Sequence, residues 1–170
     1  MAAGFCRMKL SVNEVMALAA RATRGAGAPP AQAAMFGRAA MFHLAAARSE
    51  DDLTAALEAF PQGPILTLPL VFIGILTEDC SDTPLPPDVA TELVQSYAEA
   101  QPFFTTLHPG GQQMQITVAR KSPSPGPAIA RITMSEDLFT FLNHLAARIL
   151  VPESEASRIA GAGAGLTDND

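Results

Sequence analysis

The first half of the chain carries hydrophobic residues at helical spacing. Ser11 and Glu14 form a capping-box pattern, and apolar positions recur after them every three or four residues. A proline pair at 29–30 opens a second segment, residues 31–48, which is apolar on nearly all sides. Residues 49–52 are a serine followed by three acids, which favour the start of a third helix. The pattern predicts three helices, the second of them mostly buried.

The second half mixes short apolar runs with turn-forming residues. Residues 64–76 are apolar, and period alone does not decide whether they form strands or a short helix. Residues 103–107, 113–120 and 128–134 read as strands separated by Pro- and Gly-rich turns. We expect a hairpin with a long tip, or a three-stranded meander. Residues 135–150 follow as a helix with a serine cap and two acids in its first turn.

These elements predict a single α+β domain, in which N-terminal helices and one long C-terminal helix pack on a small antiparallel sheet. We expect residues 1–8 to be a loose leader and residues 9–170 to form the domain. Within it, residues 9–60 are the helical part, 61–134 the mixed and strand part, and 135–170 the last helix with a Gly-rich tail. The predicted core residues are Val15, Met16, Phe36, Ala40, Leu53, Leu57, Ile116, Val118, Ile132, Leu138, Phe141, Leu142, Leu145 and Ile149.

Composition narrows the class of protein. Hydrophobic residues make up 48% of the 170 residues and charged residues 16%, unlike a disordered chain. A net charge of −6 argues against a nucleic-acid surface, and no apolar run reaches the length of a membrane span. Two cysteines in so long a chain fit a reduced, cytoplasmic setting. Much of the apolar content is alanine, so we expect an oligomer that completes its burial with a neighbouring chain.

Two small-residue segments are the candidate ligand site. Arg24 stands before Gly25 and Gly27, and glycines let backbone N–H groups approach an anion that an arginine also binds. An ordinary helix stop is the alternative for these residues. The last 17 residues repeat the pattern with Ser154, Ser157, Arg158, Gly161, Gly163, Gly165, Asp168 and Asp170. The two aspartates could bind an amine or a divalent cation, and a disordered tail is the alternative.

Common catalytic motifs are absent from the sequence. It holds no phosphate-binding loop, CxxC pair, HExxH or GxSxG, so we predict no metal site and no resident cofactor. The three histidines are scattered along the chain. We interpret His43 and His144 as satisfied core or boundary histidines, and His108 as exposed in a turn.

The two ends of the chain resemble an uncharacterised bacterial family, the domain of unknown function 3726. The resemblance rests on Leu10–Glu14, Arg24–Gly27 and residues 151–170, and the C-terminal string is its most specific part. Residues 29–32, Pro-Pro-Ala-Gln, depart from it. The resemblance implies no reaction, but it favours an ordered tail that docks.

The sequence leaves two classes of function open. One is a cytoplasmic domain or small enzyme that binds a carboxylate or phosphate metabolite through its Arg/Gly loops. The other is a homo-oligomeric or partner-binding scaffold without a catalytic site, with Met35, Met41 and Phe42 at the contact. A Ser-His-acid hydrolase is a distant third. We expect neither nucleic acid nor membrane as a partner.

Overall fold

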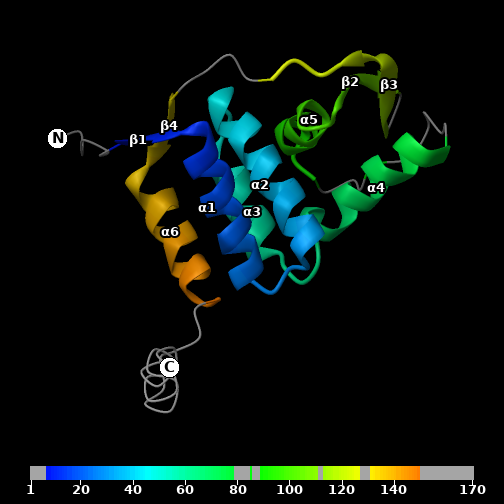
Figure 1. The fold of residues 1–170 in the computed structure, drawn as a ribbon. Coiled ribbons are helices and arrows are strands. Elements are labelled where there is room, and N and C mark those ends of the chain that lie inside the picture. Colours follow the sequence, from blue (N-terminus) through cyan, green and yellow to red (C-terminus); the bar gives the residue numbers. More distant parts are fainter. Residues whose placement is uncertain (1–6, 79–84, 86–88, 111–112, 127–130, 150–170) are drawn as a thin grey trace, which may run out of the picture.

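We describe the protein from a computed structural model, in residues 7–78, 85, 89–110, 113–126 and 131–149. Six helices and four strands follow one another along these residues (Figure 1). In chain order they are β1 Arg7–Ser11, α1 Val12–Gly25, α2 Pro30–Ala45, α3 Glu50–Glu58, α4 Pro64–Glu78, α5 Thr91–Glu99, β2 Phe103–Gly110, β3 Gln113–Pro123, β4 Arg131–Ser135 and α6 Glu136–Ala147. The α+β class is therefore confirmed.

Helix α2 is the central element of the core. It packs against α1 on one side and α5 on the other, and it also contacts α4 and β4 (Figure 1). A Cβ at Gly37 would lie 2.6 Å from the carbonyl oxygen of Met16, so α1 and α2 approach at backbone distance. Phe36 and Met41 are buried, while Met35 and Phe42 are half-buried against the core. The apolar character of α2 is thus explained by burial within the chain.

The strands form two separate antiparallel pairs. β2 pairs with β3 as a hairpin, whereas the expected long-tipped hairpin of residues 113–120 with residues 128–134 is wrong. β4 does not extend the β2–β3 hairpin into a meander, because it pairs with β1 on the opposite side of the helices, Arg7 opposite Ser135 and Ser11 opposite Arg131 (Figure 1). Residues 7 and 8, which we expected in a leader, belong to β1. Residues 1–6 lie outside the described residues.

The apolar segment that the sequence left undecided is one helix, α4, with Pro69 inside it. No charged residue occurs between Glu58 and Glu78. Leu70 and Ile73 are 61% and 48% exposed, so α4 presents an uncharged apolar face to solvent. Among the described residues, no helix combines the length and hydrophobicity that crossing a membrane requires.

Most of the predicted core is buried. Ten of the predicted core residues are confirmed as buried, and Met16, Val118 and Phe141 are partly buried against them. The prediction for Ile149 is wrong, because this residue follows the end of α6 and is 39% exposed. Helix α6 packs mainly on α1, and it also contacts both strands of the β1–β4 pair.

Candidate functional site

The short turn between α2 and α3 organises a polar network beneath the surface. Helix α2 ends in a Schellman motif, in which the Ala47 amide donates to the Leu44 carbonyl and the Arg48 amide to the His43 carbonyl. Ala47 has a φ of 53°, a left-handed conformation that usually falls to glycine. This geometry places Arg48 and Ser49 directly after the buried end of α2.

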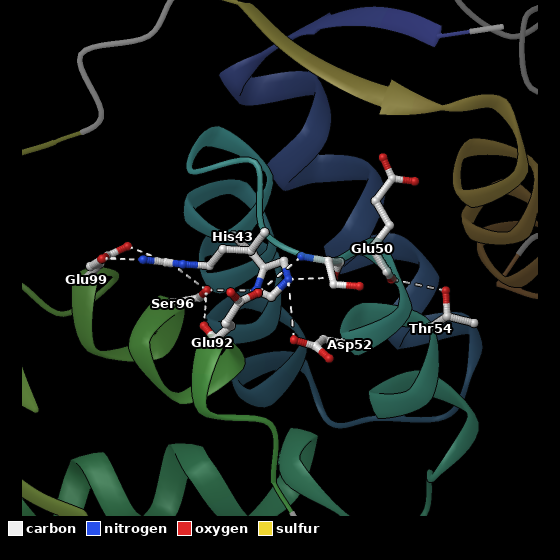
Figure 2. Close-up of polar contacts among 9 residues, drawn as sticks. His43, Glu50, Asp52, Thr54, Glu92, Ser96 and Glu99 are labelled. Carbon is white, nitrogen blue, oxygen red and sulfur yellow. Dashed lines mark hydrogen bonds and ion pairs between the residues drawn. The ribbon is translucent and has the colours of Figure 1, made fainter. Parts of the chain in front are cut away.

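His43 lies at the centre of the network and has no exposed surface. Its Nδ1 is 2.9 Å from the Ser96 hydroxyl of α5, and its Nε2 is 2.7 Å from the Ser49 carbonyl (Figure 2). The Ser49 carbonyl only accepts, so Nε2 carries a proton and donates it. The neighbouring carboxylates are Asp52, 3.9 Å from Nε2, and Glu92, whose side chain accepts from the Ser49 amide.

Arg48 joins the turn to α5 through a bidentate ion pair. Its Nη1 and Nη2 donate to the two carboxylate oxygens of Glu99 at 2.8 and 2.6 Å. Nη1 also donates to Ser96 at 2.8 Å, so a single hydroxyl contacts both Arg48 and His43 (Figure 2). Burial alone would raise the pKa of Glu99, but hydrogen bonds from Arg48 and Gln95 outweigh it, and the pKa lies below its ordinary value.

Burial lowers the pKa of His43 from its ordinary value and outweighs the opposing effects of the Ser49 carbonyl and Asp52. In the neutral ring Nδ1 carries no proton, so it can only accept a hydrogen bond, and the Ser96 hydroxyl has a single proton to donate. That hydroxyl is also 2.7 Å from the Glu92 carbonyl, to which it can donate instead. The network therefore contains a neutral imidazole, and the direction of the Ser96 O–H decides whether Nδ1 or the Glu92 carbonyl receives its hydrogen bond.

Glu50 links the start of α3 to the start of α6. Its carboxylate accepts from the Ser135 amide at 2.9 Å and also from the Ser135 hydroxyl. Ser135 in turn caps α6 by accepting from the Leu138 amide. The carboxylate therefore lies at a helix N-terminus, where negative charge is favoured.

A pocket of about 600 Å³ lies between this turn and strand β4. The strands contribute Arg7, Arg131, Ile132, Thr133 and Ser135, and the turn and helix ends contribute Leu44, Ala45, Ala47, Arg48, Ser49, Glu50 and Asp51. Its size is within the ordinary range of small-ligand sites. The pocket joins an apolar floor to charged walls.

The charged side chains that line the pocket differ in how closely other described residues bind them. Arg48 is bound to Glu99 and Glu50 to Ser135, as described above. Arg7 and Arg131 are exposed, and within the described part of the chain Arg131 has a single ion pair, with Glu14, at 3.9 Å. Lys9 lies on the same exposed face of the β1–β4 pair. Arg7, Lys9 and Arg131 thus form a basic surface on a chain whose net charge is −6.

Three of the network's side chains lie close enough to hold a cation. Ligand atoms of His43, Asp52 and Glu92 are all within 4.8 Å of one another. The Nε2 of His43 already donates to Ser49 at 2.7 Å, which removes its lone pair from coordination. We therefore assign no ion to this group.

The structure accounts for the first predicted ligand segment by packing. Gly25 contacts α6 so closely that a Cβ there would lie 1.8 Å from the Leu145 carbonyl oxygen. Gly27, with a φ of 106°, follows the end of α1, and its amide donates to the Arg24 carbonyl. Arg24 is exposed in the last turn of α1. These contacts engage the Gly27 amide that the predicted anion site would use, and the ligand role stays a prediction.

The second predicted segment lies outside the described residues, so the structure does not bring it together with the first. This applies to Ser154, Ser157, Arg158, Gly161, Gly163, Gly165, Asp168 and Asp170. Of the histidines, His43 is buried, while His108 and His144 are exposed; for His144 this differs from the core or boundary position expected.

Sequence reasoning missed the residues that the fold gathers at the pocket. Arg48 and Glu99 are 51 positions apart, and Arg7 and Arg131 line the same pocket only because β1 pairs with β4. Glu50 was recognised solely as a helix-start acid. The alternation of Arg7, Met8, Lys9 and Leu10 was the available signal for a strand.

Comparison with protein-family models, curated proteins and solved structures gives no significant match for the chain. The resemblance to the domain of unknown function 3726 stays a prediction. The site is therefore interpreted from its own chemistry.

Proposed function

We propose that this protein is a binding module for ligands that carry a carboxylate or phosphate group, held in the pocket between β4 and the α2–α3 turn. The observation that carries the proposal is the pair Arg7 and Arg131. Both line the pocket and are exposed, and neither is held in a close ion pair among the described residues. Guanidinium groups match carboxylate and phosphate geometry with paired donors.

Other lining residues offer further contacts, while two acids, Glu50 and Asp51, also line the pocket. Arg48 lies at the turn in its ion pair with Glu99, and the hydroxyls of Ser49 and Thr133 are available as further donors. Leu44, Ala45 and Ala47 supply an apolar floor for the rest of a ligand. No group in this arrangement is placed as a nucleophile with its base, so the proposal is binding without catalysis. A cytoplasmic location remains part of the proposal.

Calorimetry and thermal shift at low salt test the proposal with glutamate, succinate, citrate and inorganic phosphate as probes. We expect at least one anion to bind the parent chain. Arg7→Gln and Arg131→Gln should each weaken binding about tenfold or more, because each removes a charge-assisted hydrogen-bond donor. Arg48 is unsuitable as a test position because it also supports the fold.

Arg38→Gln is the matched control, since Arg38 is exposed on α2 and does not line the pocket. Arg24→Gln and Arg158→Gln test the two sequence-predicted segments in the same assay. Unchanged binding in both the Arg7 and Arg131 variants would overturn the proposed site. A loss confined to the Arg24 and Arg158 variants would place the ligand in the glycine-rich segments instead.

Self-association through α4 is the second candidate function. The exposed Leu70 and Ile73 on an uncharged helix favour it, because exposed apolar faces of this kind commonly mark contact surfaces. Light scattering would show a dimer for the parent chain, and a double variant Leu70→Glu with Ile73→Lys should be monomeric and equally folded. A monomeric parent chain at high micromolar concentration would exclude this candidate.

A further inference from the structure

We infer that the ligand of this pocket is an extended peptide with acidic side chains, which adds as a strand to the outer edge of β4. The inference rests on the proposed anion site and names the class of ligand that the site takes. It is carried by the backbone of β4, by the residues that face the pocket and by their charge.

The direction of the β4 backbone is fixed by Ser135. Its amide donates to Glu50, away from β1, although Ser135 stands opposite Arg7 in the strand register. In an antiparallel pair, the N–H and C=O of one residue point to the same edge, and this direction alternates along the strand. The backbone groups of Thr133 and Arg131 therefore also point away from β1.

These groups have no partner among the residues that the structure describes. β4 pairs only with β1 there, and no other described residue donates to or accepts from the backbone of Thr133 or Arg131. Both residues line the pocket, so their outward N–H and C=O groups face the space between β4 and the α2–α3 turn. A free strand edge beside a groove is the arrangement that accepts an added strand.

The charges at this edge select the partner. Arg7, Lys9 and Arg131 share the exposed face of the β1–β4 pair. The two acids of the pocket, Glu50 and Asp51, belong to α3, and Glu50 is engaged by Ser135. Two such edges would bring like charges together, so a second copy of this chain is disfavoured. A strand with carboxylates on the same face is attracted, and its alternate side chains face the apolar floor at Leu44 and Ala45.

The length of the added strand follows from the geometry. β4 has five residues, and Glu50 already satisfies the Ser135 amide at its end. A segment of about five residues spans about 17 Å, which matches this edge. The register gives the pattern acidic–apolar–acidic–apolar–acidic, and we use a fluorescein-labelled Glu-Val-Glu-Val-Glu peptide as the probe.

Thr133→Pro is the decisive variant. Proline removes the outward N–H of Thr133 and leaves the β1–β4 hydrogen bonds intact, because those are made by Met134 and Ile132. We expect fluorescence anisotropy to show peptide binding about tenfold weaker or lost, while binding of the small anions stays as in the parent. Thr133→Val, which keeps the N–H, is the matched control and should bind the peptide like the parent.

The peptide itself gives a second measurement that does not depend on a variant folding. One probe is N-methylated at its valines and another at its glutamates, so that each blocks one of the two backbone registers. One of them should bind about tenfold more weakly and the other like the unmodified peptide.

Equal binding of both methylated probes, or of Thr133→Pro and the parent, would overturn the strand addition. Binding of small anions without binding of the peptide would overturn this inference and leave the proposed function standing. Binding of neither would overturn both.

Discussion

Arg48 and Glu99 lie side by side in a bidentate ion pair that fastens the α2–α3 turn to the end of α5, at N–O distances of 2.8 and 2.6 Å. Their side chains are only 14% and 32% exposed, so the pair is partly shielded from water. The same guanidinium donates to Ser96, which contacts His43. One ion pair therefore supports both the pocket wall and the buried histidine.

Replacement of Glu99 by glutamine should lower the free energy of unfolding by about 1–2 kcal/mol, because it leaves a partly buried guanidinium with a weaker partner. Urea denaturation measures this loss, with the exposed Glu58→Gln as control. The folded pKa of Glu99 lies below 4.5, so its contribution is present above that pH and is lost as pH falls through the folded pKa. A variant with the acid sensitivity of the parent would contradict this role.

Acidification should also destabilise the fold through His43. Its folded pKa lies below 6.5, so between the folded and unfolded pKa values the unfolded state binds more protons. Stability is therefore full above about pH 6.5 and falls as pH drops, at up to about 1.4 kcal/mol per pH unit. The titratable and charged neighbours are Asp52, Glu92, Arg48 and Glu99, from α3, α5 and the turn.

His43→Gln tests this dependence by urea denaturation from pH 7.5 to 5. The variant should be less stable than the parent at neutral pH but should lose less stability on acidification. The exposed His144→Gln should keep the slope of the parent. If His43→Gln and the parent share one slope, another group is responsible.

Gly25→Ala should destabilise the protein by about 3 kcal/mol or more, since the new Cβ would overlap the Leu145 carbonyl and push α1 away from α6. Gly74→Ala is the matched control in another helix, because a Cβ there meets nothing within 4 Å. It should stabilise α4 by about 0.5–1 kcal/mol. Thermal unfolding of the two variants separates close packing from a general effect of glycine, and equal stability of both would refute the packing role.

Ala47→Gly should stabilise the chain by about 0.5–1 kcal/mol. Left-handed backbone costs alanine more than glycine, and this difference exceeds the entropy that glycine loses on folding. Ala47 also lines the pocket, so calorimetry should find anion binding unchanged if the turn keeps its shape. A lower melting temperature would show that another contact holds the turn.

The starts of α1 and α6 could be predicted because capping residues mark them in the sequence. The capping box of Ser11 and Glu14 is present, with both of its hydrogen bonds, and Ser135 caps α6 as expected. The undecided residues 64–76 lie in a helix that tolerates Pro69, and no local rule decides that outcome. Periodicity reports which face is buried but not what it is buried against.

The pocket could not be predicted because it depends on contacts between distant residues. Arg7 stood in the expected leader, and β4 was expected to join the hairpin strands instead of β1. The sequence also does not show that α6 approaches Gly25 at backbone distance, which gives this glycine a packing role; the ligand role of Arg24 and Gly25 stays a prediction.

The pairing of β1 with β4 also bears on the order of events during protein synthesis. The partner of Arg7 is Ser135, which is translated after nearly the whole helical part. At roughly 5–20 residues per second, the first strand waits on the order of ten seconds for it. During this interval α1 and α2 can associate, but the β1–β4 pair that carries Arg7 and Arg131 has not yet formed. The wall of the pocket that holds both Arg7 and Arg131 is therefore completed late in synthesis, when β4 pairs with β1.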